Sequence, residues 1–188
     1  LPVSFPRAGG SQPATYLAAP LAARNEVSNV DPSALFAFGH GLSYTPITWS
    51  PATTSASSSI DGDVLGEWAT DGRIRIEVTV HNPHQRPATE IVQLYLHDPV
   101  AETVRPVQQL VAAARVELAA GETRIAVFTL HADLTSYTGR EGRRIVDQGT
   151  VELWVAASSK DIREKLRFRL AGRAARWAPI VSSPPKSR

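Results

Sequence analysis

Hydrophobic and polar residues alternate most regularly between positions 73 and 81. Isoleucine or valine stands at every even position from 74 to 80, and charged or polar residues stand between them. Strict alternation with a period of two is typical of a strand that buries one face. The pattern therefore predicts a strand over 73–81, which Asn82-Pro83 ends.

Further strand-like segments follow at short intervals. Residues 90–97 are apolar on both faces, which predicts a central strand that is covered on both sides. Seven or so short strands, separated by turn signals and without a helical pattern between them, predict an antiparallel β-sandwich. The other segments expected to form strands are 44–49, 108–118, 123–130, 145–146, 151–157 and 166–170.

A glycine-rich segment precedes this run of strands and reads Phe38-Gly39-His40-Gly41-Leu42-Ser43-Tyr44. Glycine tolerates positive φ, so Gly-His-Gly predicts a sharp turn. Phe36, Phe38 and Tyr44 are the expected anchors, because each aromatic ring can bury a large apolar area. A packed corner at the start of the β domain is the favoured interpretation, and a ligand loop with His40 at its tip is the alternative.

The chain divides by composition into four parts. Residues 1–7 resemble a short strand that has no partner of its own, and residues 8–40 form an extended connector rich in small residues, proline and asparagine. We expect the β-sandwich to occupy residues 41–171 and residues 172–188 to be a flexible basic tail. Split from its sheet, the first segment should be disordered or paired with another molecule, because an unpaired strand leaves backbone groups unsatisfied.

Composition narrows the possible functions. The 188 residues contain no cysteine, which excludes disulfides, thiolate metal sites and a cysteine nucleophile. The chain also lacks methionine and starts at Leu1, so we expect it to be a processed product or a segment of a longer polypeptide. No apolar run is long enough to span a membrane, and a location in the cytoplasm or outside the cell stays open.

Charge is concentrated at the C-terminal end. Nine Lys or Arg and only two Asp or Glu lie between Lys160 and Arg188, whereas the formal net charge of the whole chain is +2. The basic residues between 163 and 169 alternate with apolar ones, as on the outward face of an edge strand, where they discourage aggregation. We therefore do not expect nucleic-acid binding, which would pair such charge with stacking aromatics.

Candidate catalytic groups do not form a recognisable constellation. The five histidines lack the spacing of a zinc site, and we expect neither a metal nor a cofactor. No nucleophile elbow or phosphate-binding glycine loop is present. The candidate sugar contacts are Trp68 and Trp154, which could stack on a saccharide but could equally fill gaps in the core.

Three segments resemble the C-terminal part of glycoside hydrolase family 3 enzymes, the β-glucosidases and β-xylosidases. Residues 1–6 are similar to the closing strand of that family's α/β-sandwich domain, and residues 38–45 to the signature at the entry of its fibronectin type III-like domain. Segments 90–96, 120–123 and 155–162 resemble the body of that domain. The chain departs from the family at Ala37, where proline is usual.

The resemblance implies an immunoglobulin-like sandwich of the fibronectin type III type, with an accessory role and no catalytic residue of its own. In the family the nucleophile and the acid/base residue lie upstream, in catalytic domains that would be this chain's partners. The expected docking face comprises Gln93, Tyr95, Ile125 and Val127. The alternatives are a carbohydrate-binding module that recruits polysaccharide and a surface-interaction module.

Overall fold

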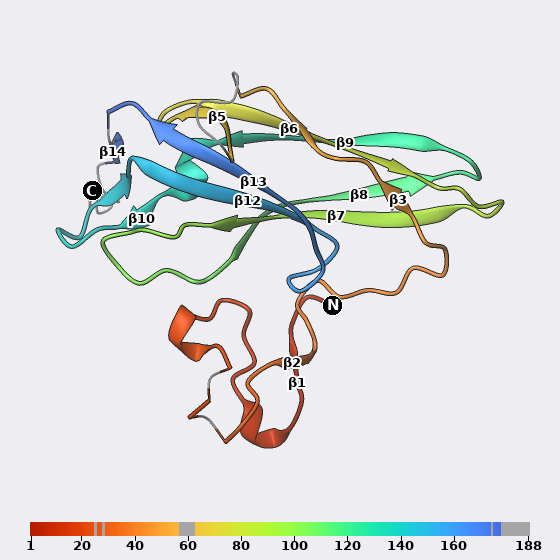
Figure 1. Ribbon diagram of the computed structural model, residues 1–188, viewed down its shortest axis with the longest axis horizontal. Coiled ribbons are helices and arrows are strands. Elements are labelled where there is room, and N and C mark those ends of the chain that lie inside the picture. Colours follow the sequence, from red (N-terminus) through yellow and green to blue (C-terminus); the bar gives the residue numbers. More distant parts are fainter. Residues whose placement is uncertain (25, 28, 57–62, 174, 178–188) are drawn as a thin grey trace, which may run out of the picture.

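The protein is an all-β structure in a computed structural model that describes residues 1–24, 26–27, 29–56, 63–173 and 175–177 (Figure 1). In this part of the chain no residue lies in an α-helix, and the helical turns are the 3-10 segments η1 (Gly9–Ser11), η2 (Pro20–Ala22) and η3 (Ala132–Thr135). None of the helical segments seen there is long and apolar enough to cross a membrane. The β class predicted from the alternating pattern is confirmed.

The larger sheet has five strands in the order β5-β13-β12-β7-β8. Its neighbouring strands are antiparallel except that β5 runs parallel to β13. The segment predicted to be a central strand is β7, which lies between β12 and β8 and is therefore paired on both edges. The bounds of these strands are Val64–Ala69 for β5, Ala88–His97 for β7, Gln109–Leu118 for β8, Gly149–Ala156 for β12 and Ile162–Ala171 for β13.

The smaller sheet is built around β6 (Arg73–His81), whose bounds match the strand that the alternation predicts. Along its whole length β6 pairs with β9 (Thr123–His131), and on the other side it pairs with β3 (Thr48–Trp49) and β4 (Thr53–Thr54). The strand predicted over 44–49 is thus only two residues long. Proline has no N–H to donate to a ladder, so Pro46 accounts for the late start.

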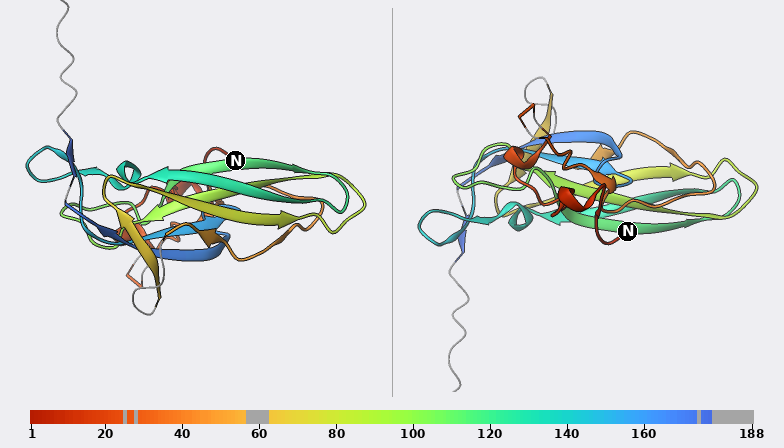
Figure 2. Two further views of the ribbon diagram at one scale, coloured as in Figure 1. Left: turned by 90° about the horizontal axis from the view of Figure 1, so that it is seen from above. Right: turned by 90° about the horizontal axis from the view of Figure 1, so that it is seen from below.

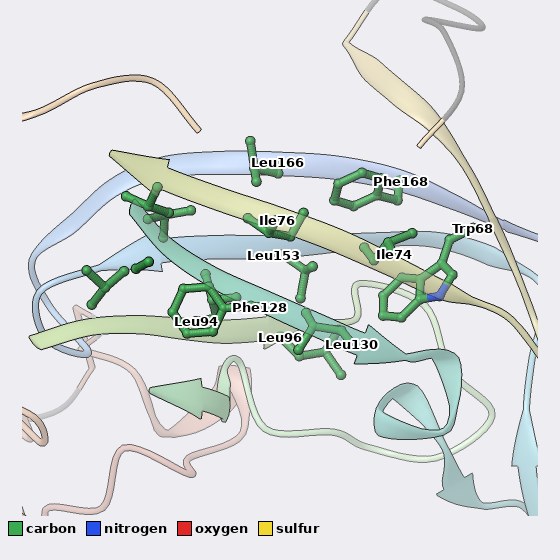
Figure 3. Packing of buried hydrophobic residues seen from close by; sticks show 14 of the residues in the cluster. Trp68, Ile74, Ile76, Leu94, Leu96, Phe128, Leu130, Leu153, Leu166 and Phe168 are labelled. Carbon is green, nitrogen blue, oxygen red and sulfur yellow. The ribbon is translucent and has the colours of Figure 1, made fainter. Parts of the chain in front are cut away.

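The two sheets enclose one hydrophobic core (Figure 3). The even-numbered side chains of β6 point inward, and Ile76, Val78 and Val80 are at most 1% exposed. They face apolar side chains from the larger sheet, such as Leu94, Leu153 and Phe168 in Figure 3. The period-2 pattern of β6 is therefore the pattern of a strand packed between a core and solvent.

The basic strand β13 is not the edge strand that the sequence predicts. It lies between β12 and β5, because β5, which the pattern did not reveal, pairs with it as the edge. One of its basic side chains, Arg167, donates from Nη2 to Glu152 Oε1 over 2.8 Å on the neighbouring strand. The outward arginine is thus paired within the sheet as well as facing solvent.

A small third sheet extends the sandwich at its C-terminal end. Its central strand β11 (Arg144–Val146) pairs with β10 (Tyr137–Thr138) and with β14 (Ala175–Trp177). Part of the segment expected to be a flexible tail is therefore a strand, since β11 offers it a free edge. The rest of that predicted tail, residues 178–188, lies outside the described residues.

The N-terminal segment and the connector lie below the sandwich in Figure 1 and over it in the view from below in Figure 2. Strand β1 (Phe5–Pro6) pairs antiparallel with β2 (Ala34–Phe36), and the rings of Phe5 and Phe36 meet edge to face at 6.3 Å. The expectation that residues 1–7 would be disordered or would pair with another molecule was wrong, because the connector folds back to supply a partner. They do not join either sheet of the sandwich.

Candidate functional site

The connector is held on the outer face of the larger sheet by an aromatic cluster. The ring of Phe38 stacks on Tyr16 with centroids 4.1 Å apart, and Tyr16 meets the edge of Tyr95 at 6.0 Å. Tyr95 and Trp154 form the base of this cluster on β7 and β12. Phe38 is thus an anchor, as the sequence predicts, and Tyr16 is its stacking partner.

Phe38-Gly39 turns sharply beneath β7. Gly39 has a φ of 78°, in the left-handed region that favours glycine. A Cβ at this position would lie 2.2 Å from Oε1 of Gln93, a separation that real atoms do not adopt. Gly39 is therefore required both by its backbone conformation and by the close approach of the Gln93 amide.

Gln93 joins the clasp, which we define as residues 38–44, to the sandwich. Its Nε2 donates to the carbonyl oxygens of Gly39 at 3.2 Å and Ala157 at 2.7 Å, and its Oε1 accepts from the Tyr95 hydroxyl at 2.6 Å. The backbone N–H of Ser159 completes the attachment by donating to the carbonyl of Phe38 at 2.9 Å. A buried amide with all these partners satisfied fixes the position of the chain that it bridges.

Burial of this network also affects ionisation. Removal from water raises the pKa of the Tyr95 hydroxyl well above its ordinary value, and the neighbouring Tyr16 acts in the same direction. The hydroxyl therefore stays protonated and keeps donating to Gln93 throughout the physiological range.

His40 follows the turn without entering a catalytic arrangement. Its backbone N–H donates to the Ala37 carbonyl at 3.0 Å, and its ring lies 5.5 Å from that of Phe36. No group of three or more His, Cys, Asp or Glu side chains that could hold a metal ion occurs in the described part of the chain. These contacts are those of a packed corner, and the ligand loop with His40 at its tip stays the alternative interpretation.

The second half of the clasp points into solvent. Leu42 is 83% exposed and Tyr44 is 100% exposed, although both are large and apolar or aromatic. The expectation that Tyr44 anchors the corner was wrong, because no element of the described chain lies over its ring. Gly41 also lies in open space: a Cβ there would meet no heavy atom within 4 Å, whereas a Cβ on Gly39 would collide with Gln93.

The four residues expected to share one docking face lie on two opposite faces. Gln93 and Tyr95 are buried beneath the connector on the outer side of β7. Ile125 and Val127 are exposed on β9, on the outer side of the other sheet. Within each strand the two residues are two positions apart and share one face. However, β7 and β9 belong to different sheets of the sandwich, so no single partner surface contains all four residues.

The two tryptophans singled out for sugar stacking are both buried. Trp68 is 1% exposed and packs edge to face against Phe168 at 6.4 Å within the core (Figure 3). Trp154 is 8% exposed, and the Lys165 ammonium lies 4.2 Å from its ring centroid. Neither ring offers a free face to a saccharide, because neighbouring side chains cover the faces of both rings.

Comparison with known proteins agrees with this geometry. Residues 90–159 match the fibronectin type III-like domain family. The β-glucosidase of Rhizobium radiobacter is 38% identical over 137 residues, which are 72% of this chain and 16% of that enzyme. The β-xylosidase of Formosa agariphila is 31% identical over 163 residues, which are 85% of this chain and 21% of that enzyme.

A solved structure extends the match to most of the fold. The β-glucosidase from Erythrobacter marinus superimposes with a TM-score of 0.78 at 28% identity, over 91% of this chain and 21% of that one. The chain thus spans about a fifth or less of the length of the relatives it matches. It belongs to the fibronectin type III-like domains of family 3 glycoside hydrolases, the accessory part of β-glucosidases and β-xylosidases.

Proposed function

We propose that this chain is the domain through which a family 3 glycosidase braces its catalytic domains, with residues 1–44 as the contact surface. The whole enzyme would hydrolyse terminal β-D-glucosides or β-D-xylosides, as the names of the relatives suggest. The chain itself would supply no catalytic group. We assign residues 1–7 to the last strand of the upstream domain, 8–40 to the connector, 41–171 to the fibronectin type III-like domain and 172–188 to a basic tail, in which residues 175–177 form β14.

The observation that carries this proposal is the concentration of exposed apolar side chains before residue 45. Leu21 is 94% exposed, and Leu42 and Tyr44 are exposed to a similar degree. Among the large apolar residues described after residue 45, only Val100 and Val104, in the loop that follows β7, exceed the 54% of Ile125. Burying one such side chain contributes about 1.5–3 kcal/mol. A surface of this kind marks a protein–protein contact. Further members are Leu1, Val3, Phe5, Leu17, Leu35 and Phe36.

The clasp explains how such a contact would set the position of the sandwich. Its half-buried part, Phe38-Gly39, is fixed to β7 and to the loop at Ala157–Ser159, while its exposed part, Leu42 to Tyr44, faces solvent. A partner that covers Leu42 and Tyr44 would therefore be held rigidly relative to both sheets. The role supported best is mechanical alignment of two parts of one polypeptide.

The first test is the coding sequence that precedes Leu1, which should encode the two catalytic domains of the family. Expressed as a separate polypeptide, that upstream region should co-purify with this chain. The double variant Leu42→Ser/Tyr44→Ser should weaken co-purification. The matched control Ile125→Ser/Val127→Ser removes two exposed apolar residues from the opposite face and should not.

The chain alone should leave aryl β-glucosides and aryl β-xylosides intact. Turnover by a clean preparation, or equal loss of co-purification in both double variants, would contradict the proposal. Affinity electrophoresis on xylan and cellulose addresses the polysaccharide-binding alternative. Retardation there would favour that alternative, although its candidate contacts Trp68 and Trp154 are buried.

A further inference from the structure

Strand β9 forms an open edge of the smaller sheet. All nine of its residues, from Thr123 to His131, are in register with β6, and β9 pairs with no other strand of the described residues. In an antiparallel ladder the residues alternate in direction, so about half of the β9 backbone groups point away from β6. Such groups are a template for a further strand.

The three long-strand edges of the sandwich differ in how they are protected. The edge strand β5 is only six residues long and contains Gly66 and Glu67. The edge strand β8 carries Arg115 and Glu117, and its pairing with β7 shifts register at Leu94/Tyr95. By contrast, residues 125–130 of β9 read Ile-Ala-Val-Phe-Thr-Leu, without charge, proline or glycine. Within residues 125–130, β9 therefore has none of the devices that blunt an exposed edge, and Arg124 at its start is its one permanently charged residue.

The outer face of the same strand is apolar. Ile125 is 54% exposed and Val127 is 46% exposed, and the two are neighbours on one side of the pleat. On β6 they lie beside Thr79 and Glu77, the latter in an ion pair with Arg75 at 2.6 Å. An apolar pair on an unpaired edge is the combination that strand addition would cover.

We propose that β9 pairs antiparallel with β9 of a second copy of this chain, around a two-fold axis at Val127. In this register Val127 of one molecule lies opposite Val127 of the other, and Ile125 lies opposite Thr129 of the other molecule. Arg124 is the one residue of β9 that is always charged. It lies opposite Leu130 of the second copy and so meets no like charge. The smaller sheets of two molecules then join into one continuous sheet, and the interface is isologous because both molecules contribute the same strand.

A second copy is the occupant that fits, because Tyr16 and Phe38 of the connector pack on the outer face of the larger sheet, and the clasp approaches β9 only at its first residues, near Arg124. In Figure 1 the connector is below the sheets and β9 runs along the upper side. This step rests on the proposed function, which assigns the connector side to the catalytic domains of the same polypeptide. A partner strand from another protein would have to match the apolar pair, whereas a second copy matches it by symmetry.

Single-cysteine variants of the full 188-residue chain test the register, since the native sequence has no cysteine. Val127→Cys would place two thiols opposite each other across the axis, where cross-strand Cβ atoms are about 4.5–5.5 Å apart and modest adjustment permits a disulfide. Mild oxidation should convert it to a cross-linked dimer. The control Leu65→Cys places an exposed thiol on β5, the edge strand of the other sheet, and should stay largely monomeric.

Sedimentation velocity of the native chain over a concentration series tests the association itself. We expect a monomer–dimer equilibrium. Val127→Lys opposes two like charges and should raise the dissociation constant at least ~10-fold, while Leu65→Lys should not change it. Circular dichroism checks that both variants are folded.

Three results would overturn the inference: a native chain that is monomeric at every concentration, cross-linking of Val127→Cys no greater than that of Leu65→Cys, or a folded Val127→Lys variant that dimerises like the parent. None of these measurements involves the upstream polypeptide. Failure of the dimer is therefore distinguishable from failure of the proposed function.

Discussion

Replacing Gly39 by alanine tests the clasp most directly. The backbone there has a φ of 78°, and the left-handed region costs a residue with a Cβ roughly 1–2 kcal/mol. The new Cβ would also lie 2.2 Å from Oε1 of Gln93 and would push the amide away from its partners. Loss of one or two hydrogen bonds adds about 1 kcal/mol each. We expect a total destabilisation of about 2–4 kcal/mol.

Gly41→Ala is the matched control two positions away. A Cβ there meets no heavy atom within 4 Å, and the φ of Gly41 is not in the left-handed region. The free energy of unfolding should therefore change by less than about 0.5 kcal/mol, as for ordinary surface substitutions. A contrast between two glycines of one short motif separates the effect of this clasp from the general cost of replacing glycine.

Urea unfolding followed by circular dichroism measures both variants. With an m-value of about 2 kcal/mol/M, the Gly39→Ala midpoint should fall by about 1–2 M. If the connector detaches before the sandwich unfolds, limited proteolysis should cut residues 12–37 faster in Gly39→Ala than in Gly41→Ala. Parent-like midpoints and parent-like cleavage in Gly39→Ala would refute the argument that Gln93 holds the turn.

Two further substitutions test the surroundings of the clasp. Tyr95→Phe removes the hydroxyl that donates to Gln93 Oε1 at 2.6 Å, so it should lower the free energy of unfolding by about 1–2 kcal/mol in the same urea assay; an unchanged midpoint would contradict this. Burial acts to raise the pKa of Glu152, but hydrogen bonds from Trp154 and Arg167 outweigh it and lower this pKa below its ordinary value of 4.5. The ionised Glu152 carboxylate should therefore stabilise the folded chain above pH 4.5, and this contribution should be lost as the pH falls through the lowered pKa. The difference in urea midpoint between the parent and Glu152→Gln should shrink on acidification, and a constant difference would show that the carboxylate is not responsible.

The local pattern of apolar and polar residues was sufficient to predict the principal strands of the sandwich. A strand's side chains alternate between its two faces, so the alternation of isoleucine and valine in residues 73–81 identified β6 and its inward face without reference to any other strand. Gly39 and Phe38 were likewise visible, because a left-handed turn and a stacked ring need particular residue types. Edge status was not visible, since β13 becomes an internal strand only when β5, distant in sequence, pairs with it.

The amino-acid sequence by itself determined the all-β class, the principal strands and the family, because these depend on short-range periodicity and on a specific motif. Only the tertiary structure decided what each outward side chain meets. It buried Gln93, Tyr95, Trp68 and Trp154, and it left Tyr44 bare. The physical reason is that alternation states which face of a strand a residue occupies, whereas burial of that face depends on segments far away in the chain that fold over it.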